Sequence, residues 1–235
     1  MLTEQDYRNG QIILIDKPLQ WTSFQVVNKL RWAIRKNFGI KKIKVGHAGT
    51  LDPLASGLLI LCTGKFTKQI PQLQGQVKEY TGTITLGATT PSYDLETEID
   101  QTFPIDHITN EDIIAATAIF TGEIEQYPPI FSALKKDGKR LYEYARAGTT
   151  VAIKSRKITI HHFEITRIAL PEVDFKVICS KGTYIRSLAH DFGKALQSGG
   201  HLTALRRTSI GSFSIEDATT VEAFVKQVST KIETA

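Results

Sequence analysis

The sequence has only two cysteines and no long apolar run, and each scarcity excludes a class of protein. Cys62 and Cys179 stand inside short apolar runs, which favours buried thiols over a disulfide scaffold or a cysteine metal site. No apolar stretch approaches the roughly 20 residues that cross a bilayer, and the N-terminus lacks the pattern of a signal peptide. These absences predict a cytoplasmic protein without a membrane partner.

Lysine and arginine are absent from Glu79 to Leu134, a stretch that holds ten of the acidic residues. The whole chain still carries a net charge of +5, so the remainder is strongly basic. This split favours a basic surface for a polyanion, with an acidic lobe at about residues 87–125 kept off it. We expect Asp94–Asp112 to face away from phosphate. A solvated basic surface without a partner explains the charge alone equally well.

Hydrophobic periodicity and turn residues predict an α+β protein. Asp137-Gly138 is expected to form the turn of a hairpin. Runs of strands with a few helices between them favour a mixed, mostly antiparallel sheet. No repeat or linker divides the chain, so we expect a single domain over residues 1–235. Helices are expected at about 23–38, 109–120, 183–197 and 221–228, and strands at about 11–16, 79–86, 157–168, 174–180 and 202–213.

The segment Gly46–Gly57, which reads GHAGTLDPLASG, places one acid among glycines and small residues. Glycine permits backbone conformations that are closed to other residues, and Pro53 fixes the chain just after the acid. The pattern predicts a rigid loop that presents a single carboxylate, that of Asp52. Aspartate before proline also begins ordinary turns, so the loop by itself leaves a purely structural role open.

The same loop resembles the signature segment of the TruB family, the bacterial tRNA pseudouridine synthases. Six motifs in the order of the family are a specific signal. The resemblance implies the pseudouridine synthase fold, with a sheet flanked by helices and a catalytic cleft across the sheet. The other matching segments are Ile15–Pro18, Lys78–Tyr80, Ser132–Lys135 with Leu141–Ala145, Ser180–Arg186 and Leu205–Arg207.

The resemblance implies an isomerase that converts uridine 55 in the T arm of tRNA to pseudouridine. The N1–C1′ bond breaks, the uracil turns, and C5 bonds to C1′. Because no electrons or outside atoms enter, no cofactor is expected, and the base must be flipped out of its stack. Asp52 is the implied nucleophile, either by direct attack on C1′ or by way of a glycal intermediate.

Three further residues carry implied roles in catalysis or substrate binding. Tyr80 is expected to stack on the target uracil and to take part in proton removal. Tyr184 and Arg186 stand two residues apart, so in an extended segment they would share one face. An arginine beside Asp52 would lower the pKa of that carboxyl. The alternatives are a core aromatic for Tyr80 and a surface ion pair for Arg186.

His47 and Leu205 complete the implied substrate pocket. His47 matches the histidine that fills the space left by the flipped nucleotide, and Leu205 matches an apolar wall. Ordinary core packing predicts nearly the same surroundings for Leu205. His47 and Asp52 could also be ligands of a metal ion. Their spacing fits no known metal-binding motif, so we expect no metal site.

Basic residues in or beside the motifs are candidates for phosphate contacts. The basic stretch Lys36–Lys44 adds to them. Neutralising Lys41, Lys42 and Lys44 is expected to weaken tRNA binding and to flatten its salt dependence. The motif candidates are Lys17, Lys78, Lys135, Lys139, Arg140, Arg206 and Arg207.

About 28 residues follow Arg207, too few for the C-terminal RNA-binding domain that many family members carry. We therefore expect tRNA binding without that appendage and without a guide RNA. We also expect a monomer, since one protein per tRNA arm suffices. One alternative is a stand-alone synthase that acts on another RNA uridine. The others are a non-catalytic RNA-binding protein of the same fold and a metal-dependent hydrolase that a chelator would inhibit.

Overall fold

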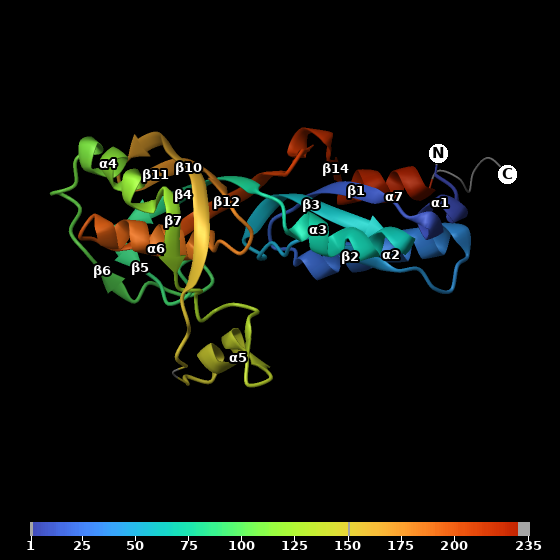
Figure 1. The fold of residues 1–235 in the computed structure, drawn as a ribbon, viewed down its shortest axis with the longest axis horizontal. Helices are drawn as coiled ribbons and strands as arrows, with labels where there is room; N and C mark the ends of the chain where they lie inside the picture. Colours follow the sequence, from blue (N-terminus) through green and yellow to red (C-terminus); the bar gives the residue numbers. More distant parts are fainter. Residues whose placement is uncertain (1, 150, 230–235) are drawn as a thin grey trace. The chain divides into compact units, whose positions relative to one another are not determined.

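The computed structural model describes residues 2–149 and 151–229 and shows helices and strands interspersed along the chain (Figure 1). It divides into two compact units, one of Met1–Glu79 with Arg206–Ala235 and one of Tyr80–Leu205. Strands β4 (Lys78–Leu86) and β12 (Gly200–Ile210) each contain a boundary between the units. The chain therefore passes from one unit to the other within two strands.

The first unit is built around β1 (Ile12–Lys17) and β3 (Ala55–Thr63), which pair in antiparallel register with Ile15 opposite Leu59. The short strand β14 (Thr219–Thr220) runs parallel to β1. Strand β12 pairs with β3 as well. The short strand β2 (Val45–His47) pairs with β3, and the short strand β13 (Phe213–Ser214) pairs with β12.

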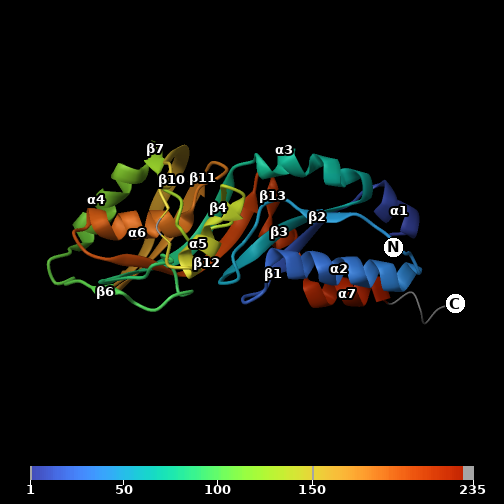
Figure 2. The ribbon, with the colours of Figure 1, turned by 90° about the horizontal axis from the view of Figure 1, so that it is seen from below.

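Strand β3 is buried on both faces. Alternate residues of a strand point to opposite sides, and those of β3 pack into two different cores. Leu59 and Leu61 pack in a core with residues of α2 (Ser23–Phe38) and α7 (Val221–Ser229). Leu58, Ile60 and Cys62 face the opposite core, which includes Leu73 of α3 (Ile70–Gln74). Figure 2 shows α2 and α7 side by side and α3 across the sheet from them.

Helix α2 begins and ends where the sequence predicts. Thr22 and Gln25 form a capping box at its start, and Gly39 ends it with a φ of 63°. The short helices α1 (Glu4–Asn9) and η1 (Gly64–Gln69) were not expected, because six residues hold too little periodicity to detect. Both belong to the first unit.

The second unit holds the strands in the order β12-β4-β11-β10-β7. Its long antiparallel pair is β10 (Arg156–Ala169) with β11 (Glu172–Cys179), and β7 (Gly122–Gln126) lies beyond β10. Helices α4 (Asn110–Phe120) and α6 (Ile185–Ala195) pack against this sheet. Four aromatic rings join these helices to the strands, those of Phe120, Phe163, Phe175 and Phe192.

The remaining elements of the second unit are small. The predicted hairpin is confirmed as β8 (Lys135–Lys136) and β9 (Lys139–Arg140), with φ of 51° at Asp137 and 82° at Gly138. It leads into α5 (Leu141–Arg146). Strands β5 (Ala88–Thr89) and β6 (Gln101–Thr102) form a second short pair.

The expected α+β class and mixed, mostly antiparallel sheet are confirmed. Both cysteines are buried, as the sequence predicts. Across residues 2–149 and 151–229, no helix is long and apolar enough to cross a bilayer. The single domain expected over residues 1–235 stays a prediction, and its residues 1, 150 and 230–235 lie outside the described ranges.

Candidate active site

Asp52 lies in the loop between β2 and β3, and backbone contacts hold this loop from several sides. Ser23, in the first turn of α2, accepts from the Leu51 N–H at 2.9 Å and donates to the Leu51 carbonyl at 3.1 Å. The Gln20 N–H donates to the Pro53 carbonyl at 2.7 Å. Both neighbours of Asp52 are therefore tethered, which presents its carboxylate from a rigid loop, as predicted.

Arg207 of β12 fastens the same loop. Its side chain is buried, with Nε donating to the Leu58 carbonyl at 2.8 Å and Nη2 to the Gly49 carbonyl at 3.0 Å. Gly57 has a φ of 101°, and a Cβ there would lie 2.3 Å from the Arg207 carbonyl oxygen. Only glycine fits that approach, which explains one glycine of the signature loop.

Lys17, at the end of β1, is fully buried beside this loop. Its Nζ donates to the carbonyls of Pro18 at 2.9 Å and Trp21 at 2.7 Å. Burial lowers the pKa of Lys17 to about 8, although the negative charge of Asp52 acts to raise it. Lys17 thus holds the segment between β1 and α2, and Arg207 holds the Asp52 loop. The predicted phosphate contacts of both residues stay predictions.

The remaining basic candidates of the first unit are Arg206 and Lys78. Arg206 forms a two-pronged ion pair with Asp16, with distances of 3.0 and 2.7 Å from its Nη atoms to the carboxylate oxygens. Lys78 is buried, and its Nζ donates to the carbonyls of Gln74 and Gln76. The pair of Arg206 with Asp16 links the Asp-Lys-Pro motif to the last motif of the chain.

His47 is the last residue of β2 and is half-buried. Burial lowers the pKa of His47. A hydrogen bond with the Gly49 backbone acts to raise this pKa, and the positive charge of Arg207 acts to lower it. The neutral form of the ring is therefore favoured. Within residues 2–149 and 151–229, no three His, Cys, Asp or Glu side chains are grouped to hold a metal ion.

In the second unit, Tyr80 is buried on β4 and Leu205 is half-buried on β12. The extended arrangement expected for Tyr184 and Arg186 is wrong, because α6 begins at Ile185. The amide of Gln126 holds Tyr184 instead, accepting from its N–H at 2.8 Å and donating to its carbonyl at 3.0 Å.

Arg186 is buried in the first turn of α6 and contacts three groups of its own unit. Its Nη atoms donate to the carbonyls of Ser92 at 3.2 Å and Phe131 at 3.0 Å. Nη1 lies 3.5 Å from the carboxylate of Asp94, and both side chains are only 6% exposed. The surface ion pair considered for Arg186 is thus wrong. Asp94, one acid of the predicted acidic lobe, is buried against this arginine, and the lobe itself stays a prediction.

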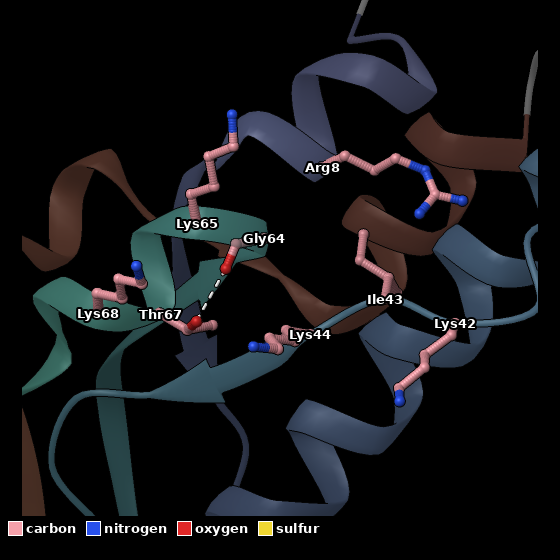
Figure 3. A pocket seen from close by; sticks show the side chains of 8 residues that line it. All are labelled: Arg8, Lys42, Ile43, Lys44, Gly64, Lys65, Thr67 and Lys68. Carbon is pink, nitrogen blue, oxygen red and sulfur yellow. Dashed lines mark hydrogen bonds between the residues drawn. The ribbon is translucent and has the colours of Figure 1, made fainter.

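The exposed basic candidates lie at two places. Lys135, Lys139 and Arg140 are exposed on the β8–β9 hairpin, where Lys135 stands opposite Arg140. The other place is a hollow of about 370 Å³ in the first unit (Figure 3). We call it the basic hollow, because cationic side chains surround it; Lys41 is not among them. They are Arg8, Lys42, Lys44, Lys65 and Lys68.

A family model described as "TruB family pseudouridylate synthase (N terminal domain)" matches residues 35–185, more than half of the chain. The chain belongs to the TruB family. A second model, described as "tRNA pseudouridylate synthase B C-terminal domain", matches residues 186–234. The resemblance seen in the six motifs is therefore confirmed.

Relatives within the TruB family match the chain over nearly its whole length. A protein named tRNA pseudouridine synthase B from Flavobacterium johnsoniae is 65% identical, covering 95% of this chain and 98% of the relative. One of the same name from Phocaeicola vulgatus is 55% identical, covering 93% of each.

Solved structures support the pseudouridine synthase fold. The crystal structure of a Cbf5-Nop10-Gar1 complex matches with 32% identity and a TM-score of 0.71, over 95% of this chain and 55% of that one. An H/ACA RNP bound to a substrate RNA containing 2'-deoxyuridine matches with 28% identity and a TM-score of 0.68, over 96% and 55%.

Sequence reasoning missed the residues that hold the site in place. The sequence places Ser23 only at the start of a helix, whereas its hydroxyl also holds both backbone groups of Leu51. For Asp94 the sequence predicts only a position away from phosphate, and nothing in the sequence marks Gln126. Each acts on a residue far away in the sequence, so no local pattern marks it.

Proposed function

We propose that this chain isomerises uridine 55 in the T arm of tRNA to pseudouridine, with Asp52 as the nucleophile. The observation that carries the proposal is the Asp52 loop, tethered at Leu51 and Pro53 and backed by Arg207. Membership of the TruB family supports the reaction. The name shared by relatives up to 65% identical supports tRNA as the substrate.

The reaction assigns a separate task to each residue. Asp52 acts at C1′ as the N1–C1′ bond breaks, by direct attack or through a glycal, and C5 then bonds to C1′. The proton on C5 leaves and N1 gains one, so the composition of the RNA does not change. Tyr80 stacks on the uracil and takes part in proton removal, and Tyr184, His47 and Leu205 bind the flipped nucleotide.

Arg186 is proposed to favour the ionised form of Asp52 and to orient its carboxylate. Its own orientation is set by Ser92, Asp94 and Phe131. A buried arginine with several acceptors has little freedom to move, which suits a group that must hold a nucleophile in place.

The proposal places the enzyme in the bacterial cytoplasm, acting as a monomer without a guide RNA or a cofactor. The Flavobacterium johnsoniae and Phocaeicola vulgatus relatives are covered over 98% and 93% of their length, whereas the chains from the Cbf5 and H/ACA structures are covered over 55%. This chain thus matches nearly the full length of the former and about half the length of the latter.

The test is incubation of the purified chain with an unmodified tRNA transcript, followed by mapping of pseudouridine. We expect product at position 55, and a loss of about a thousandfold or more in Asp52→Asn because no other group replaces the nucleophile. Asp106→Asn, an exposed aspartate of the second unit, is the control and should keep full activity.

Three outcomes of this assay would contradict parts of the proposal. Equal product from Asp52→Asn refutes the mechanism. Product at another uridine refutes only the position. Loss of activity on adding a chelator would favour metal-dependent chemistry involving His47 and Asp52.

A further inference from the structure

The turn that carries Asp94 contains a strained residue. Tyr93 has a φ of 64°, in the left-handed region that bulky side chains rarely adopt. Its backbone is bonded on both sides, the N–H to the Thr90 carbonyl at 3.1 Å and the carbonyl to the Leu202 N–H at 2.9 Å. Glycine would adopt this conformation without strain. A tyrosine here indicates that its side chain makes a contact of value.

That contact is with His190. The two rings are stacked, with centroids 4.0 Å apart and an angle of 16° between their planes. His190 lies on α6 four residues after Arg186, so both side chains are on one face of the helix. Arg186 meets Ser92 and Asp94, and His190 meets the residue between them. One face of α6 therefore contacts three consecutive residues of the turn, Ser92 to Asp94.

The His190 ring contacts Tyr93 through its flat face and not through a hydrogen bond of its Nδ1. Its Nδ1 is buried and has no hydrogen-bond partner among the described residues. Burial lowers the pKa of His190, the positive charge of Lys194 lowers it further, and Asp100 opposes both. A flat ring is what stacking on tyrosine requires.

We infer that His190 is a positioning residue, which stacks on Tyr93 and thereby fixes the turn whose Ser92 and Asp94 orient Arg186. The inference rests on the proposed function, because the role of Arg186 belongs to it. His190 itself contacts neither the substrate nor the reacting atoms in this account. Loss of its ring should slow the chemical step and leave tRNA affinity unchanged.

The test compares His190→Ala with His190→Phe, which keeps a flat ring. Single-turnover isomerisation by His190→Ala should be about tenfold or more slower, because small displacements of a catalytic group are costly. Its dissociation constant for tRNA should stay within about twofold of the native value. His190→Phe should restore most of the rate. His162→Ala, at an exposed histidine of β10, is the matched control.

A second comparison tests the path through Tyr93. If the two rings act as one unit, Tyr93→Gly with His190→Ala should be no slower than Tyr93→Gly alone. Where His190→Ala is unfolded at the assay temperature, His190→Leu replaces it, since leucine fills the space without a flat ring.

The outcomes separate this inference from the proposed function. A full rate in the ringless variant, or an equal loss in His190→Phe, overturns the positioning role while the native enzyme remains active. A native chain that makes no pseudouridine refutes the proposed function instead. A lower melting temperature with an unchanged rate assigns the stack to stability alone and also overturns the inference.

Discussion

Lys17 shows how one buried charge supports a loop. Its ammonium donates to two carbonyls in the segment after β1, those of Pro18 and Trp21. The same burial disfavours its charged form and lowers its pKa to about 8. The motif lysine is therefore explained by structure before any contact with RNA is considered.

This pKa makes the stability of the chain depend on pH. Between pH 8 and 10.5 the folded state binds fewer protons at Lys17 than the unfolded state does, so the free energy of unfolding gains a contribution that rises with pH. Compared with Lys17→Met, the native chain should gain relative stability across this range. Urea unfolding at a series of pH values measures the difference.

The control for Lys17 is Lys41→Met, an exposed lysine of the same unit. Its difference from the native chain should be flat with pH in the same experiment. A flat difference for Lys17→Met as well would show that its pKa is not depressed.

At the scale of elements, the segment between α2 and β2 is the part that the structure sharpens most. The sequence groups Lys41, Lys42 and Lys44 as phosphate contacts, but only Lys42 and Lys44 line the basic hollow (Figure 3). Three residues of β2 span about 10 Å and connect Lys44 to His47 and the Asp52 loop. The basic hollow and the Asp52 loop thus adjoin opposite ends of β2.

We therefore expect Lys44→Gln to weaken tRNA binding and Lys41→Gln to leave it nearly unchanged. The slope of log affinity against log salt should fall by about 0.7 to 0.9 for one lost phosphate contact. Fluorescence anisotropy with labelled tRNA over a range of salt concentrations measures both variants. Equal slopes for the two would argue for a diffuse basic surface in place of a defined contact.

At the scale of the whole molecule, the proposed catalytic residues are divided between the two units. Asp52 belongs to the first, whereas Tyr80 and Arg186 belong to the second. Strands β4 and β12 pass through both. Unfolding either unit would break the pairing of these strands, so we expect the chain to unfold as one cooperative domain.

The two tryptophans make this prediction measurable, because Trp21 and Trp32 both lie in the first unit. Tryptophan fluorescence therefore follows that unit, and far-ultraviolet circular dichroism follows both. Coincident urea transitions by the two probes are expected for a single domain. A circular dichroism transition with a second phase that fluorescence lacks would contradict it.

The sequence alone predicted most of the longer elements and singled out Asp52 as the proposed nucleophile, because both depend on local patterns. The capping box at Thr22, the turn at Asp137-Gly138 and the signature loop around Asp52 each depend on residues a few positions apart. These local patterns can be recognised in the sequence without any knowledge of the fold.

Only the tertiary structure decided what surrounds that nucleophile and its predicted arginine. It placed Ser23 on Leu51, Arg207 on Gly49, and Asp94 with the Tyr93–His190 stack around Arg186. Several of these partners stand about a hundred positions or more apart in the chain. A buried charge is satisfied by whatever the fold brings beside it, and such proximity leaves no periodicity for a sequence to reveal.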